Sequence, residues 1–371
     1  MPATVRRRYI REEARLRRRP LQRQDAESVN QRRAGYNLGM RTNGHKSVTT
    51  ARLTTEVGVL LRCLFALLVL GGVVFLSGGL AVRPAAAQDG AWENELSGWR
   101  VQHAAELQKP DGWLSLAGLE WLDAGDNSFG SAADNKIHLP AAGPAHLGVL
   151  HLEGATVTLR APSGGFPKDF SVGGKPAQEQ ELRVDADHDK NDPRMTIGGL
   201  QAYVIKRGDK FALRIKDAQS AALTGFHGLK WYAPDAKYRV TARWAPYQPY
   251  KSITLLTLIG TSYAQPVPGA AEITLGGKSY RLEPVLEDPA VEKLFFILKD
   301  TTSTTTTYGA CRFLYTGFPD HGLEKPGELV LDFNRLENPP CAYTPFATCP
   351  LPPPGNRLAI ALPVGEQRYH E

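Results

Sequence analysis

Polar side chains that could do chemistry gather beside apolar segments in the last quarter of the chain. Asp300 ends the run KLFFILKD, Asp332 ends GELVLD, and Arg312 lies inside the apolar run ACRFLY. A buried arginine needs a carboxylate partner, because an unpaired buried charge is strongly destabilising. We therefore expect Arg312 either to form a structural or surface ion pair with an aspartate, or to bind a ligand.

Such a cluster predicts a pocket for a small polar or anionic ligand, since an arginine beside carboxylates and amides suits an oxyanion. In a catalytic pocket, a carboxylate would be the general base of a hydrolytic reaction. The residue types do not decide between binding and catalysis, and they identify no cofactor. The candidate pocket consists of Asp300, Tyr308, Arg312, Asp332, Asn334, Asn338 and Asn356.

Residues 338–358 carry seven prolines and two cysteines, which excludes a helix or a central strand. We predict an ordered, rigid loop, because proline lowers the entropy that ordering costs. Cys341 and Cys349 are the expected disulfide in an oxidising compartment, with a thiol or metal site as the alternative. Cys311 lies in an apolar, strand-like run and is expected to be a buried, unpaired thiol.

The motifs of common enzyme classes are missing from the sequence. There is no G-x-S-x-G, H-E-x-x-H, P-loop or dinucleotide-binding glycine pattern, and the nine histidines show no metal-ligand spacing. The run Asp185–Asp192 alternates carboxylates as a calcium loop does, but Lys190 and Thr196 stand where that loop needs Gly and Glu. We interpret this run as a solvated turn and predict no metal site.

The basic charge of the chain belongs to its N-terminal part. Residues 1–87 hold 16 Lys and Arg against 5 Asp and Glu, so the remaining 28 basic and 33 acidic residues give residues 88–371 a net charge of −5. A basic patch is what nucleic-acid binding requires. We therefore expect no nucleic-acid partner for residues 88–371.

The N-terminal part has the layout of a secretory signal. An apolar run over residues 60–82, which carries no charge from Cys63 onward, has Arg52 and Arg62 just upstream of that uncharged part and leads to an A-x-A site, which predicts export and cleavage after Ala87. An uncleaved membrane anchor is the alternative, because the run is long enough to span a bilayer. We expect the signal to occupy residues 40–87, beginning at Met40. Residues 1–39 are either a basic disordered extension or a mis-assigned gene start.

Residues 88–371 are expected to form a mainly β domain. AWENELSGWRVQHAAELQ, residues 91–108, predicts one amphipathic helix whose apolar positions are Trp92, Leu96, Trp99, Val101 and Ala105. About nine alternating segments separated by Gly and Pro then predict antiparallel sheets in a sandwich or barrel-like arrangement. Arg207-Gly208-Asp209 and Gly276-Gly277 mark hairpin turns. The length allows a single large domain or two packed β subdomains.

Several stretches resemble the bacterial domain of unknown function family 1684. They are DGWLSLAGLEWL, NSFGS, RGDKFALRIKD, TYGACRFL, DFNRLENPPCAYTPFATCPLPPPGNRL and the closing GE, spread over nearly all of residues 91–371. The resemblance implies little chemistry. It implies that Asn334, Asn338, Cys341, Cys349, Pro350 and Asn356 belong to one motif. The family is usually glycine-rich before Arg312, where this chain has Ala310-Cys311, so Cys311 is expected to be incidental.

The sequence thus favours an exported small-molecule-binding β domain, with a hydrolase-type activity left open. The alternative is a structural or protein-interaction component of the cell envelope, in which the proline-rich loop is only a stabilising clamp.

Overall fold

The computed structural model describes residues 85–141, 143–184, 193–287 and 291–370. The basic extension, nearly all of the predicted signal and the Asp185–Asp192 run lie outside these residues. Over the part that is described, no helix combines the length and apolarity needed to cross a membrane.

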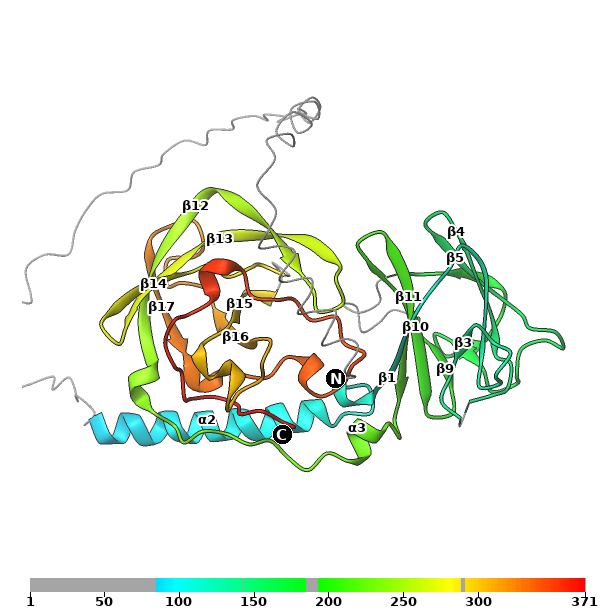
Figure 1. Ribbon diagram of the computed structural model, residues 1–371, viewed down its shortest axis with the longest axis horizontal. Coiled ribbons are helices and arrows are strands. Elements are labelled where there is room, and N and C mark those ends of the chain that lie inside the picture. The colour runs from blue at the N-terminus through cyan, green and yellow to red at the C-terminus, as the bar shows by residue number, and fades with distance from the viewer. Residues whose placement is uncertain (1–84, 142, 185–192, 288–290, 371) are drawn as a thin grey trace, which may run out of the picture. The chain divides into compact units, whose positions relative to one another are not determined.

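The predicted mainly β class is confirmed (Figure 1). Strands pair antiparallel in four sheets, with one short parallel pair, and no sheet among the described residues closes into a barrel. The same residues form two α-helices, α2 (Ala85–Leu107) and the short α3 (Ala221–Thr224). Ser220 caps α3 by accepting a hydrogen bond from the backbone N–H of Leu223.

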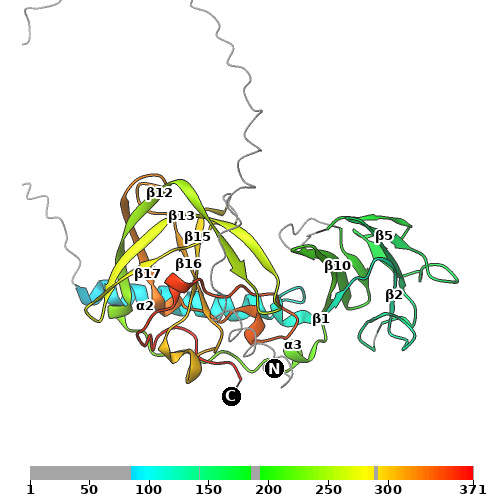
Figure 2. The same ribbon diagram turned by 45° about the horizontal axis from the view of Figure 1, so that its top comes forward.

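Helix α2 begins six residues before the predicted start at Ala91. Its inward-facing stripe is Trp92, Leu96, Trp99, His103 and Leu107. These residues recur every three or four positions, as one face of a helix requires. Val101 was predicted to share this face but is 70% exposed, and Ala105 is also exposed, because their positions fall off the stripe. Figures 1 and 2 both show α2 running alongside the strands of the second β region.

The first β region contains a six-stranded sheet in the order β1-β11-β10-β9-β6-β7 and a five-stranded sheet in the order β3-β2-β4-β5-β8. Their apolar faces share one core that includes Phe129, Leu150, Phe170 and Leu213. The predicted hairpin at Gly208 is confirmed, because β10 and β11 pair from Arg207 and Lys210 outward. The strands are β1 (Leu116–Trp121), β2 (Gly125–Gly130), β3 (Ile137–His138), β4 (Gly148–Glu153), β5 (Thr156–Arg160), β6 (Ser171–Val172), β7 (Lys175–Pro176), β8 (Gln180–Leu182), β9 (Met195–Ile197), β10 (Leu200–Arg207) and β11 (Lys210–Asp217).

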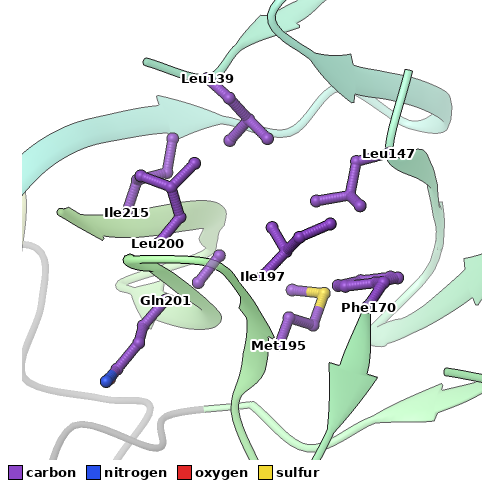
Figure 3. A pocket seen from close by; sticks show the side chains of 9 residues that line it. Leu139, Leu147, Phe170, Met195, Ile197, Leu200, Gln201 and Ile215 are labelled. Carbon is purple, nitrogen blue, oxygen red and sulfur yellow. The ribbon is translucent and has the colours of Figure 1, made fainter. Parts of the chain in front are cut away.

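The core of the first β region contains a small gap between the two sheets. Figure 3 shows apolar side chains, among them Leu139, Phe170 and Met195, pointing into it. Its volume is about 10 Å³, which is room for one water-sized sphere. A drug-sized ligand needs a site of several hundred Å³, so we interpret the gap as imperfect packing.

The second β region combines a four-stranded sheet in the order β14-β13-β12-β17 with the hairpin β15-β16. The predicted turn at Gly276-Gly277 is confirmed, since both glycines have positive φ and join β13 to β14. Trp244, Phe296, Leu314 and Phe333 belong to the buried core between these sheets. The strands are β12 (Arg239–Leu256), β13 (Ser262–Leu275), β14 (Lys278–Leu282), β15 (Lys293–Leu298), β16 (Arg312–Gly317) and β17 (Gly327–Asp332).

The proline-rich segment is an ordered loop, as predicted, and it closes the second β region. It contains two single-turn helices, η6 (Pro340–Ala342) and η7 (Pro354–Asn356), and follows η5 (Phe333–Arg335). Its backbone hydrogen-bonds to neighbouring strands at isolated points, such as Leu351 to Leu256 and Leu358 to Lys299. The remaining short helices are η1 (Trp113–Ser115), η2 (Ala236–Tyr238) and η4 (Thr301–Thr304).

Gly365 is expected to be intolerant of a side chain. Its φ is +77°, and an added Cβ would lie 2.6 Å from the carbonyl oxygen of Leu336. We expect Gly365→Ala to lower the free energy of unfolding by about 2 kcal/mol in urea denaturation. Gly154→Ala is the matched control, because its φ is +59° but nothing lies within 4 Å. Equal losses in the two variants would show that the close backbone contact has no energetic importance.

Candidate functional site

Arg312 is a buried structural arginine, which is one of its two predicted roles. Its side chain is 1% exposed, and Nη2 donates to Oδ2 of Asp300 at 2.7 Å. The same guanidinium donates to the carbonyl oxygens of Leu362, at 2.9 Å, and of Val364. Arg312 thereby fastens the C-terminal segment to strand β16. Burial lowers the pKa of Arg312, while the charge of Asp300 opposes this shift.

Asp300 uses its remaining hydrogen-bonding capacity within the same structure. Its Oδ1 accepts from the backbone and hydroxyl of Thr302, at 2.9 and 2.6 Å, and from the backbone N–H of Leu362 at 3.2 Å. With these contacts, neither oxygen of the Asp300 carboxylate faces an open pocket. The predicted pairing of Arg312 is thus found with Asp300, and Asp332 takes no part in it.

Asp332 lies beside helix α2. Its Oδ2 accepts a hydrogen bond from the Trp92 indole at 2.7 Å, and its Oδ1 accepts from the backbone and the side-chain amide of Asn334. The predicted grouping of Asp300, Arg312 and Asp332 into one pocket therefore does not occur. Asp300 and Asp332 do lie at or just after strand ends, as predicted, but the two strands end at different places in the second β region.

Asn334 and Asn356 act as substitutes for a neighbouring strand. The Asn334 amide accepts from the N–H of Asp235 and donates to its carbonyl, at 2.9 and 3.1 Å. Asn356 makes the same pair of bonds to Glu283, both at 2.9 Å. A side-chain amide has the same donor and acceptor as a peptide group, so each asparagine satisfies a backbone segment that has no strand partner. Both residues are buried, and neither is available to a ligand.

Tyr308 and the cysteines also have structural surroundings. The Tyr308 hydroxyl donates to the carbonyl oxygen of Cys341 at 3.0 Å. Cys311, Cys341 and Cys349 are free thiols, so the predicted disulfide is not formed in this structure. Instead, Sγ of Cys349 accepts a hydrogen bond from the backbone N–H of Cys341 at 3.2 Å. Burial, followed by the neighbouring Cys341, raises the pKa of both Cys311 and Cys349.

Asn338 belongs to a cluster of titratable residues that the sequence analysis did not identify. Its backbone N–H and side-chain amide donate to the two oxygens of Glu366, at 2.8 and 2.7 Å, and Tyr343 donates its hydroxyl to the same carboxylate. His103 of helix α2 completes the cluster, with Nδ1 3.4 Å from Glu337 and Nε2 3.5 Å from Glu366. The closing Gly-Glu pair was a visible signal for Glu366, whereas nothing in the sequence pointed to His103.

Burial controls the protonation of this cluster. It raises the pKa of Glu337 to about 7, with the nearby Glu366 adding to the shift and His103 opposing it. Burial alone would lower the pKa of His103, but its contact with Glu366 and the charges of Glu337 and Glu366 outweigh burial and raise it. The pKa values of Glu337 and His103, whose side chains lie 3.4 Å apart, are therefore both raised.

A cavity of about 210 Å³ lies between helix α2 and strands β16 and β17. Trp92 and Glu95 form its helical side, while Leu314, Tyr315 and Val330 come from the strands. Tyr315 and Val330 are unusually exposed for apolar residues, at 38% and 40%. The complete lining is Trp92, Glu95, Arg239, Leu314, Tyr315, Thr316, Gly317, Val330, Asp332 and Arg335. Of the residues predicted for the pocket, Asp332 is the member that lines this cavity.

The charged groups of the cavity differ in how fully they are paired. Arg335 donates to Glu95 at 2.5 Å and lies 3.8 Å from Asp332, so it links the two carboxylates. Arg239 is exposed, and it makes no salt bridge with another described residue. The cavity therefore presents an arginine whose donors are available. Within the described ranges, no group of three or more His, Cys, Asp and Glu side chains could hold a metal ion.

Residues 224–367 match the family described as "Protein of unknown function (DUF1684)", and the chain belongs to this family. The match confirms the family resemblance over a shorter span than residues 91–371. The chain is similar to the solution NMR structure of an uncharacterised protein of Haloarcula marismortui, at 30% identity, covering 39% of this chain and 78% of that one, with a TM-score of 0.34.

A second similar structure is the crystal structure of the FhaA FHA domain complexed with the intracellular domain of Rv3910. The identity is 17%, covering 26% of this chain and 97% of that one, with a TM-score of 0.18. At these TM-scores neither likeness defines the fold or function of the chain. No curated protein matches it.

The structural role of Arg312 makes a quantitative prediction. We expect Arg312→Met to lower the free energy of unfolding by about 3–5 kcal/mol, because Asp300 would be left buried without its cation. Urea denaturation at neutral pH measures the loss. Arg243→Met is the control, since the Arg243 side chain is 71% exposed in its pair with Glu272, and such pairs contribute about 1 kcal/mol or less. A loss no larger than that of the control would contradict the structural role.

Proposed function

We propose that this protein binds a small anionic molecule with an apolar portion in the cavity between α2, β16 and β17. The observation that carries the proposal is the pairing of an available arginine, Arg239, with an exposed apolar wall formed by Tyr315 and Val330. Monomeric proteins rarely leave aromatic and aliphatic side chains together in a recess unless the surface has a binding role.

Hydrogen-bonding capacity favours an acceptor-bearing ligand over a cation. Asp332 already accepts from Trp92 and Asn334, and Glu95 already accepts from Arg335. The carboxylates are therefore largely satisfied, whereas the Arg239 guanidinium has five N–H donors to offer. A carboxylate or phosphate would bind these donors with charge-assisted hydrogen bonds. The volume of about 210 Å³ restricts the ligand to a small metabolite.

Binding is favoured over hydrolysis by the positions of the carboxylates. Asp300, a candidate general base, is fully engaged with Arg312 and Thr302. Asp332, the other candidate, accepts three hydrogen bonds from Trp92 and Asn334. A general base must be free to accept a proton from the reacting group.

The alternative of a structural or interaction component of the envelope has its own support. Most residues of the predicted pocket fix the backbone, as Arg312, Asn334 and Asn356 do. If this structural alternative holds, the cavity binds no ligand, and substitutions of the residues that line it should change only the stability of the protein.

Titration with benzoate, which has a carboxylate and an apolar ring, tests the binding proposal. We expect Trp92 fluorescence or NMR shifts of cavity residues to report weak saturable binding. Arg239→Ala is expected to weaken it about ten- to a hundredfold, the effect of losing a charged hydrogen bond. Arg160→Ala, an exposed arginine of the first β region paired with Asp126, is the matched control and should change nothing. Benzyl alcohol should bind more weakly than benzoate. Equal affinities for Arg239→Ala and the native chain would overturn the proposal.

We propose in addition that residues 60–82 export the chain and that cleavage follows Ala87. The basic flank, the uncharged run and the Ala-rich end support this assignment. Intact mass measurement of the exported fraction should give a chain starting at Gln88. A chain retaining residues 60–82 in the membrane fraction would instead establish an anchor, and a chain confined to the cytoplasm would refute export altogether.

A further inference from the structure

Helix α2 is one wall of the proposed ligand cavity, and a series of polar contacts holds it in place. Trp92 donates to Asp332, Glu95 accepts from Arg335, and the Arg335 guanidinium lies 5.5 Å from the centre of the Trp99 ring. Residues 332–337 thus run beside successive turns of the helix. Any change that loosens this contact would open the wall formed by Trp92 and Glu95.

The contact between α2 and residues 332–337 ends at the cluster of His103, Glu337 and Glu366. One side of this cluster is held rigidly by the C-terminal segment. Glu366 is 1% exposed and accepts hydrogen bonds from Asn338 and Tyr343, so its position is fixed by the C-terminal segment. His103 is 13% exposed and stacks on Trp99, with the ring centres 5.5 Å apart. The charged groups near the cluster are Arg100, Lys293, Arg312 and Arg335. Arg312 and Arg335 are paired with Asp300 and Glu95.

Protonation decides the charge buried at this end of α2. With His103 and Glu337 both protonated, His103 neutralises Glu366, and the three side chains carry no net charge. Loss of the Glu337 proton leaves a net charge of −1, and loss of the His103 proton leaves −2. Buried charge without a partner is costly, and opening of the helix would hydrate it. The cluster therefore stabilises the docked helix only while its protons are bound.

We propose that His103, Glu337 and Glu366 form a pH-sensitive latch that keeps helix α2 docked and the ligand cavity closed on its helical side. The regulatory part of this inference rests on the proposed function, whereas the latch itself concerns the docking of α2 alone. A bound proton acts here as the ligand of the docked state and is released as the helix opens.

The direction of the pH effect follows from the two shifts. The pKa of Glu337 rises from 4.5 to about 7 on burial, so its contribution is complete below pH 4.5 and is lost as the pH rises to about 7. The pKa of His103 is also raised, from 6.5, so its contribution is complete below pH 6.5 and is lost as the pH rises through the raised pKa. Both effects loosen the helix as pH increases.

Hydrogen–deuterium exchange of peptides covering residues 92–107, corrected for intrinsic rates, measures the opening of α2 directly. Between pH 4.5 and 8 we expect the opening constant of the native chain to rise on the order of a hundredfold, about tenfold for each unit of pKa shift. Glu337→Gln mimics the protonated acid and should confine the rise to pH values above 6.5. The double variant with His103→Gln should show almost none. His138→Gln, an exposed histidine of the first β region, is the control and should follow the native chain.

A native chain whose α2 opening is independent of pH would overturn the latch, and so would a double variant that keeps the full dependence. If His103→Gln fails to fold, Glu337→Gln alone still decides the window below pH 6.5. Benzoate titration at pH 5 and pH 8 separates the two proposals. Weaker binding at pH 8 in step with α2 opening supports control of the cavity. If α2 opening depends on pH but benzoate binds at neither pH, the latch stands and the proposed ligand site is refuted. Equal benzoate binding at both pH values would refute the proposal that the latch controls the cavity.

Discussion

The buried ion pair between Arg312 and Asp300 is the contact on which the C-terminal half of the structure depends. One guanidinium holds the carbonyl oxygens of Leu362 and Val364 against strand β16, and Asp300 binds the Leu362 amide. This fixes the chain just before Gly365, whose positive φ turns the next residue inward. Glu366 is placed by that turn. A pair of opposite charges that is weakly stabilising by itself thus organises the backbone of an entire segment.

The position of Glu366 in turn determines where helix α2 can dock. Its carboxylate is held by Asn338 and Tyr343 and needs a positive partner, which His103 of α2 supplies. The helix also buries Leu96 completely, so apolar and polar contacts act together along one stripe. The cavity exists because the helix touches residues 332–337 closely but stands away from Tyr315 and Val330. Its walls are consequently no more stable than this docking.

Local sequence patterns predicted the elements well and the site poorly. The apolar arms around Gly208 predicted one hairpin, and the paired glycines at Gly276 predicted another, because turn chemistry is local. The burial of Arg312 with Asp300 was one of two predicted outcomes, since a charge in an apolar run has few options. The cavity was not predictable, because it joins residues from α2, β12, β16 and β17 that no short motif connects. His103 was missed for the same reason, as its two partners lie more than 200 residues away.

The structural roles of the asparagines in the family motif explain why that motif did not identify the candidate cavity. Asn334 and Asn356 each form two hydrogen bonds with the backbone of a single distant residue, and Asn338 grips Glu366 and Gln367. Amides serve this purpose because they reproduce the peptide's own donor and acceptor. Prolines in the same stretch reduce the entropy of the loop that these bonds must order. A signature rich in Asn and Pro therefore describes how a long loop is fixed without strands. Ligand chemistry is better sought where donors remain unused, which in this chain is at Arg239.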